Sequence, residues 1–184
     1  MMSILVGFVL LSVIYEGIDA NNPFVAGGPY TINVKRIDKC RNQGTGEVEF
    51  NTKISKKSPK EYILNANWTW PYDVDEFMKT KILSYKWSPP SGWMQTVFTY
   101  ETSNMCKELD QLFPKMWTSL SEAQDEENPC PLKAGKYHVE DWVLNLNLPA
   151  ENLMYGQYMV LFKFIKDNAN TIGCMAMFGE VVPL

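Results

Sequence analysis

The chain has 184 residues, a length typical of one domain. Its formal net charge is -4 and its pI is near 5.1, which argues against a nucleic-acid-binding protein, because such proteins need a surplus of Lys and Arg. Hydrophobic residues make up 46% and aromatic residues 13%, enough for a large core or for an apolar surface beyond what a core needs.

The first twenty residues are typical of a secretory signal peptide. Residues 4–15 are apolar apart from Gly7 and Ser12, a run too short to span a bilayer but suited to a signal-peptide core. Small residues at Gly17 and Ala20 place the predicted cleavage after Ala20. We therefore expect a secreted chain whose residues 21–184 form one domain. The absence of Lys and Arg before the apolar run is atypical, and a buried N-terminal strand is the alternative.

Short segments of alternating apolar and polar residues then dominate the chain. Such alternation predicts half-buried strands, and the clearest case is 62–70, where Tyr62, Leu64, Ala66, Trp68 and Trp70 share one face. The predicted strands are 30–40, 47–55, 62–70, 77–87, 93–100, 136–148, 157–167 and 171–182. Eight strands at this spacing predict a mainly β fold, an antiparallel sandwich or cup.

The end of the second predicted strand and the turn after it are basic. Their lysines are Lys53, Lys56, Lys57 and Lys60. They form either a solvated hairpin tip or a weak contact for anionic lipid headgroups.

Asn67-Trp68-Thr69 is a sequon for N-glycosylation. The alternation of the 62–70 strand points Asn67 away from the apolar face. Strand and sequon therefore agree, and we expect a glycan at Asn67.

One segment, 103–124, has helical periodicity. Its apolar residues recur at spacings of three and four. Ser103 or Asn104 is the expected N-cap, and Pro114 should kink or split the helix. The acidic residues that follow predict a solvated loop.

All four cysteines lie beyond the predicted signal peptide: Cys40, Cys106, Cys130 and Cys174. An even number in a secreted chain predicts two disulfides. Three pairings are possible, and spacing alone does not choose between them.

Residues that carry catalysis are scarce. His138 is the one histidine, it lies in an alternating strand, and the chain has no G-x-S-x-G motif, so a Ser-His-Asp triad is not expected. No cluster of His, Cys or carboxylates has metal-ligand spacing, and no glycine-rich loop could hold a phosphate. We expect neither an enzyme nor a cofactor.

Apolar bulk is in excess instead. The 158–165 segment is apolar on both faces, and the chain has ten methionines, flexible residues suited to pockets that accept varied ligands. We expect the following residues to line one apolar cavity: Leu64, Trp68, Trp70, Phe98, Trp117, Trp142, Val160, Phe162, Phe164, Met175 and Met177.

Two runs carry a family resemblance. The C-P-x-x-x-G-x-Y-x-V run contains Cys130, Gly135 and Tyr137, and the later run is LPAENLMYGQYMVLFKF. With the order of the cysteines, these runs resemble the ML lipid-recognition superfamily in its ganglioside-activator branch, and most of all the insect secreted proteins grouped with chemosensory protein B. The chain departs from the ganglioside activator in having four cysteines rather than a fuller set.

The resemblance implies a β-cup whose apolar cavity takes up lipid or another hydrophobic small molecule. It also implies two disulfides, Cys40 with Cys174 and Cys106 with Cys130. The leading hypothesis is a secreted, monomeric carrier in chemosensation that binds no nucleic acid and has a chemoreceptor or a membrane surface as a further possible partner. The alternatives are a lipid-presenting accessory protein for an enzyme or receptor, and an extracellular protein-binding module with a filled core.

Overall fold

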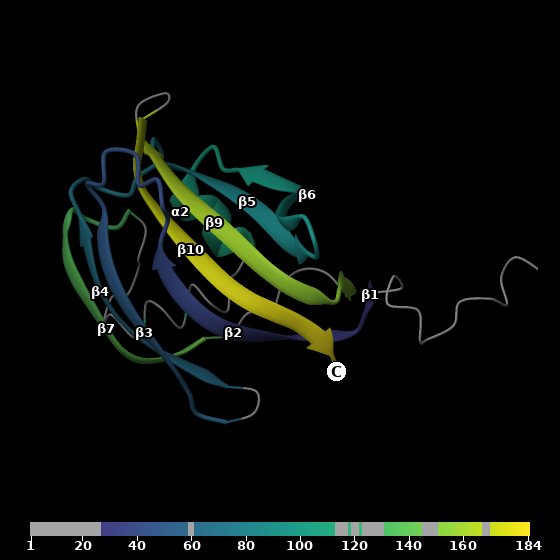
Figure 1. Ribbon diagram of the computed structural model, residues 1–184. Coiled ribbons are helices and arrows are strands. Elements are labelled where there is room, and N and C mark those ends of the chain that lie inside the picture. The colour runs from purple at the N-terminus through teal and green to yellow at the C-terminus, as the bar shows by residue number, and fades with distance from the viewer. Residues whose placement is uncertain are drawn as a thin grey trace, which may run out of the picture.

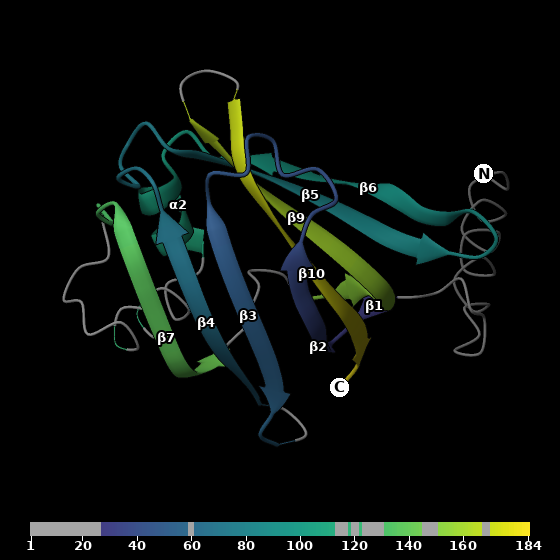
Figure 2. The ribbon, with the colours of Figure 1, turned by 60° about the vertical axis from the view of Figure 1, so that its left-hand side comes forward.

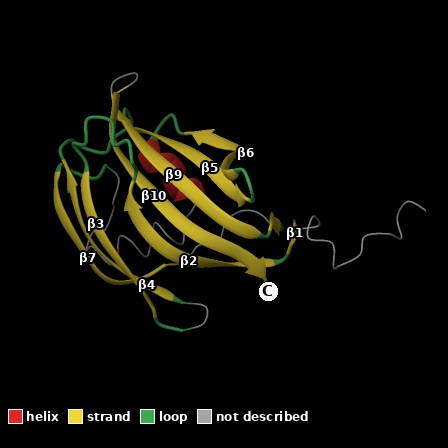
Figure 3. Ribbon diagram, in the orientation of Figure 1, coloured by secondary structure: helices red, strands yellow, loops and turns green. Residues whose placement is uncertain are grey.

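Strands form most of the fold, as Figure 3 shows. The computed structural model describes residues 27–58, 61–112, 118, 122, 131–144, 151–166 and 170–184. Its elements are β1 (Gly27–Gly28), β2 (Tyr30–Lys39), β3 (Glu49–Lys56), β4 (Tyr62–Trp70), β5 (Lys79–Ser88), β6 (Gly92–Glu101), α2 (Met105–Leu112), β7 (Gly135–Leu144), β8 (Leu153–Met154), β9 (Gly156–Lys166) and β10 (Asn170–Pro183). All eight predicted strands are present, so the predicted mainly β fold is confirmed. The predicted signal peptide lies outside the described residues.

The strands form two large antiparallel sheets. One has five strands in the order β2-β10-β9-β5-β6, and the other has three in the order β3-β4-β7. Figure 1 shows β9 and β10 side by side within the five-stranded sheet, with β3, β4 and β7 on the left. The short strands β1 and β8, which the sequence did not predict, pair with each other. The described residues include no helix long and apolar enough to cross a bilayer.

Strand β4 has the two faces that its alternation predicted. Tyr62, Leu64, Ala66 and Trp70 are buried, whereas Asn67 between them is exposed. Strand β3 follows the same rule, with Phe50 buried and its polar neighbours exposed. The three-stranded sheet therefore has an apolar inner face and a polar outer face, as expected for a sheet with one face in water.

The two sheets meet along β2 and β3. The Thr52 hydroxyl on β3 donates to the Ile37 carbonyl on β2 at 2.8 Å. The Tyr62 hydroxyl on β4 donates to the Asn33 side-chain oxygen on β2 at 3.1 Å. Figure 2 shows the three-stranded sheet and the five-stranded sheet as two layers that diverge from this seam.

A disulfide joins the ends of the first long strand and the last one. Cys40 and Cys174 are bonded, which confirms the pairing implied by the family resemblance. The Gln43 side-chain amide donates to the carbonyls of both cysteines, at 2.6 Å to Cys40 and 2.9 Å to Cys174. Cys106 is also disulfide-bonded, but its predicted partner Cys130 lies outside the described residues, so that pairing stays a prediction.

Helix α2 begins with a dense cap. Asn104 is the N-cap, because its side-chain oxygen accepts the Lys107 amide at 3.0 Å. The Glu108 carboxylate accepts the Ser103 amide and hydroxyl, both at 2.6 Å, and the Tyr100 hydroxyl at 2.6 Å. These hydrogen bonds, led by the Ser103 hydroxyl, lower the Glu108 pKa to about 2. Pro114, where a kink is expected, lies outside the described residues.

The Glu108 cap predicts a loss of stability in acid. Because the folded pKa is depressed, the contribution of Glu108 is fully present above its ordinary value of 4.5 and is lost as the pH falls toward about 2. Glu108→Gln should cost on the order of 1 kcal/mol near neutral pH, since the group is largely solvent-screened. Urea unfolding at stepped pH should show this difference shrinking below about pH 4.5. A difference that stays constant down to the lowest pH would contradict the assignment.

Candidate functional site

The apolar inner faces of the two sheets form the candidate site. From the three-stranded sheet, Leu64, Trp70 and Trp142 belong to one buried core cluster, and Trp68 packs against it. From the five-stranded sheet, Phe164 belongs to the same cluster, and Phe162, Met175 and Met177 pack against it. Residues from β4, β7, β9 and β10, far apart in the sequence, thus lie together as predicted.

One aromatic contact spans the space between the sheets. The rings of Trp70 on β4 and Phe164 on β9 meet edge to face, with centroids 5.0 Å apart and an interplanar angle of 76°. This is the preferred geometry of an aromatic pair. Along β9 and β10, Met175 lies opposite Phe162 and Met177 lies opposite Val160, so Val160 shares the inner face by register.

Several inward residues are not fully covered. Trp68, Phe162, Met175 and Met177 pack on the core cluster but are only partly buried. The inner surface of the cup is therefore apolar and partly accessible to solvent. Such a surface can bind an apolar solute without rearranging the sheets.

Two of the predicted lining residues do not join this group. Trp117 lies outside the described residues. Phe98 is 56% exposed, so the expectation that it lines the interior was wrong. Simple alternation from Tyr100, which faces inward opposite Ile82, would also turn Phe98 inward. The β5–β6 pairing is irregular between Leu83 and Tyr85, where β6 carries extra residues, and this bulge breaks the alternation.

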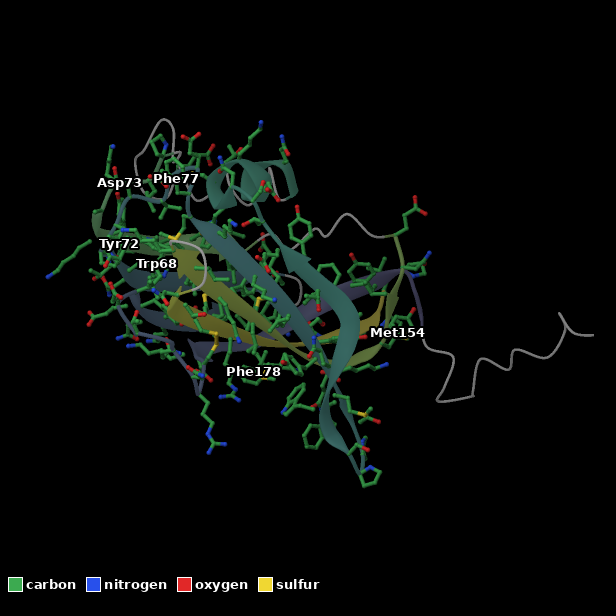
Figure 4. The ribbon with its side chains drawn as sticks, turned by 90° about the horizontal axis from the view of Figure 1, so that it is seen from above. Trp68, Tyr72, Asp73, Phe77, Met154 and Phe178 are labelled. Atoms are coloured by element: carbon green, nitrogen blue, oxygen red, sulfur yellow. A yellow bond between two sulfur atoms is a disulfide. The ribbon has the colours of Figure 1, made fainter. Side chains whose placement is uncertain are left out.

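The sequence did not reveal an aromatic cluster on the outer face of the five-stranded sheet. Trp87 and Trp93 flank the β5–β6 turn, with centroids 5.3 Å apart, and Trp93 lies 5.9 Å from Phe178 on β10. The Arg36 guanidinium lies 3.8 Å from the centre of the Phe178 ring. Figure 4 shows Phe178 well separated from Trp68. A signal was present in the sequence, because Trp87 and Trp93 are symmetric about the S-P-P-S-G turn.

The start of β7 is held by Asp73. Its carboxylate accepts the Ala134 amide at 2.8 Å and the Lys133 ammonium at 2.8 Å. The Lys133 contact is the larger cause of the lowered Asp73 pKa. The adjacent Val74 amide donates to the Leu132 carbonyl at 2.7 Å. These contacts fix the segment that leads into the Tyr137–Trp142 part of the inner face.

Tyr72 forms a polar rim beside the apolar surface. Its hydroxyl donates to Glu47 at 2.5 Å, and the Lys166 ammonium lies 3.1 Å from the centre of its ring. Hydrogen bonds from Thr45 and Tyr72 lower the Glu47 pKa. The described residues contain no group of three or more His, Cys, Asp or Glu that could hold a metal ion.

A separate pocket of about 290 Å³ is polar. It lies between the loop after β2 and the β9–β10 hairpin, and it is lined by Asn42, Gly44, Thr45, Lys163, Asn170 and Thr171. Gly44 has φ +66°, and a Cβ there would lie 1.9 Å from the Thr171 carbonyl oxygen, so the loop needs glycine at this position. The polar lining does not suit a hydrophobic ligand.

The outer face of the three-stranded sheet is polar and exposed. His138 lies opposite Asn67, and its Nδ1 is 2.8 Å from the Asn67 side-chain oxygen. His138 is thus exposed and hydrogen-bonded. Of the basic turn, Lys53, Lys56 and Lys57 are exposed, and Lys60 lies outside the described residues.

The chain is similar to several solved structures, among them the two that follow. No family model matches the chain, and no curated protein matches it. The crystal structure of chicken MD-1 complexed with lipid IVa aligns with 83% of this chain and 97% of that chain, at 13% identity and a TM-score of 0.44. A Niemann-Pick type C2 protein from the Japanese carpenter ant aligns with 79% of this chain and 98% of that chain, at 14% identity and a TM-score of 0.39. We draw no conclusion about family or ligand from likeness at this level.

The exposed sequon gives a testable prediction. Secreted protein should carry a glycan at Asn67, because the side chain faces solvent on a polar sheet face and its amide nitrogen is the atom that a glycan modifies. Glycosidase treatment should lower the mass of the parent. Thr69→Ala, which removes the sequon and keeps Asn67, should lack that mass difference. An unchanged parent mass would show that the site is unused.

Proposed function

We propose that the chain is a secreted, non-catalytic carrier of lipid or another hydrophobic small molecule, and that the ligand binds between the two sheets. The observation that carries this proposal is the partial exposure of inward apolar side chains, among them Trp68, Phe162 and Met177. Apolar side chains that are only partly covered leave apolar surface that a bound ligand can cover. The methionines add flexible walls that suit ligands of varied shape.

Apolar contact sets the scale of the affinity that this surface can supply. Removing about 300 Å² of apolar ligand surface from water gives a gross gain of about 7 kcal/mol at about 25 cal/mol per Å². Association costs reduce that figure. A Kd of 1 μM needs about 8 kcal/mol net, so a ligand must bury more apolar surface than this or add a polar contact to reach it.

Secretion and a role in chemosensation are also part of the proposal, and each is supported by a different observation. The apolar segment at residues 4–15 and the Cys40–Cys174 disulfide both suit an oxidising, extracellular compartment. The chemosensory role rests on the family resemblance of the sequence. Detection of a co-purified small molecule by native mass spectrometry of secreted protein would identify the ligand class.

A single buried charge tests the carrier function. Phe162→Asp places an unpaired carboxylate on the inner face, which costs several kcal/mol when an apolar ligand covers it. The variant should lose at least about tenfold in affinity for a fluorescent fatty-acid probe.

The matched control is Lys57→Ala, an exposed change outside the interior, which should bind as the parent does. Circular dichroism must show that both variants are folded. A parent that takes up no apolar probe would favour the protein-binding module with a filled core.

A second candidate function, a lipid-presenting accessory protein, is favoured by the β5–β6 hairpin. Trp87 and Trp93 are 41% and 37% exposed at its end, and Met94 and Phe98 are more exposed still. The hairpin from Lys79 to Glu101 contains three lysines and one acidic residue, Glu101, which pairs with Lys81 at 3.4 Å, in a chain whose net charge is -4. Exposed tryptophan with nearby lysine suits the interface of an anionic membrane. Figure 2 shows the hairpin extending away from the three-stranded sheet.

Vesicle binding separates the two functions. If the accessory role holds, the protein should co-sediment with phosphatidylcholine vesicles that contain phosphatidylserine, and the double change Trp87→Ser with Trp93→Ser should weaken binding about tenfold or more. Neutralising Lys53, Lys56, Lys57 and Lys60 to Gln should have a smaller effect, because no apolar side chain accompanies them into the interface. If the parent does not bind vesicles, the accessory function is excluded and the carrier function remains.

A further inference from the structure

Three buried polar atoms on the inner faces lack a hydrogen-bond partner. Among the described residues, these side-chain atoms are Trp68 Nε1, Trp70 Nε1 and Thr80 Oγ1. Buried donors are nearly always hydrogen-bonded in folded proteins, and each exception needs an explanation. Here the exceptions lie within the candidate site.

The three atoms come from facing surfaces. Trp68 and Trp70 are two residues apart on β4 and so share its inner face. Thr80 on β5 lies directly opposite Phe164 on β9, and the Phe164 ring contacts Trp70. Trp70 is 6% exposed and Thr80 is fully buried. Trp70 and Thr80 therefore flank Phe164 from two sheets, and Trp68 lies two residues from Trp70 on the same face of β4.

Charge on the inner surface is low. Among the described residues, the buried polar side chains are Thr80, Ser84 and Thr102, and no charged side chain is buried. Lys166 and Glu47 lie at the rim, where both contact Tyr72. A carboxylate bound beside Trp68 and Trp70 would lack a buried counter-charge, and an unpaired buried charge is strongly disfavoured.

We propose that the interior site takes neutral apolar molecules that carry an oxygen acceptor, such as long-chain alcohols, esters or ketones, and that the Trp68 and Trp70 indole N–H groups bind that oxygen. The inference rests on the proposed carrier function and narrows its ligand class. The hydroxyl of Thr80 can donate to the same ligand or accept from it.

The oxygen reaches the donors after small side-chain movements. All three atoms are shielded from solvent in this conformation. Phe162, Met175 and Met177 are among the partly buried side chains on the facing sheet. Methionine has three rotatable bonds, so Met175 and Met177 can move aside without a change in either sheet.

The test is displacement of Nile red by decane, decanol, decyl acetate and decanoate at neutral pH. The readout is the ratio of decanol to decane affinity. Trp70→Phe should lower this ratio about tenfold, the value of one hydrogen bond of about 1.4 kcal/mol, while decane binding falls less. Trp68→Phe should act in the same direction, and because Trp68 is only partly buried this variant should fold even if Trp70→Phe does not.

Phe162→Leu is the control, because it trims an apolar wall that has no donor and should weaken decane and decanol alike. A ratio that is unchanged in both tryptophan variants would overturn the inference and leave the carrier function standing. Decanoate as the strongest competitor would overturn the neutral ligand class. If Nile red itself does not bind, the proposed function fails, and this inference fails with it.

Discussion

The seam between β2 and β3 is the constraint on which the rest of the structure depends. Strand pairing stops there, and side-chain hydrogen bonds from Thr52 and Tyr62 to β2 take its place. The two sheets can therefore face each other instead of continuing as one layer, and both apolar faces turn inward. Away from the seam, the Trp70–Phe164 contact spans the interior. Because ring packing and not a backbone ladder joins the sheets at that point, the inner surface can adapt to a solute.

The faces of individual strands could be predicted from the sequence, because period-two alternation fixes which residues share a face whatever the partner strand is. This is why Leu64, Trp68 and Trp70 were placed correctly, and why Asn67 was expected to be exposed. The same reasoning brought Phe162 and Met175 to the interior from other strands. The cysteine pairing of Cys40 with Cys174 needed the family resemblance, because spacing allowed three connectivities.

Positions next to bulges could not be predicted. Phe98 was misplaced because the irregularity between Leu83 and Tyr85 is set by how β5 and β6 pair, and alternation within β6 contains no information on that pairing. A similar shift beside Phe178 turns both Lys35 and Arg36 away from the core while Val34 and Ile37 stay buried. The lack of a hydrogen-bond acceptor for the Trp68 and Trp70 indole N–H groups could not be predicted either, because it depends on every element that packs around these side chains.

The structure uses tryptophan in two different environments, and the difference bears on function. On the hairpin, Trp87 and Trp93 pack against each other while part of each ring stays in contact with water, which can accept hydrogen bonds from their N–H groups. Inside the cup, Trp68 and Trp70 have no such acceptor. The outer pair is therefore suited to an interface between water and an apolar phase. The inner pair is suited to a solute that brings its own oxygen. A molecule with an apolar chain and one neutral oxygen can meet both environments in turn, first at the membrane interface and then in the interior.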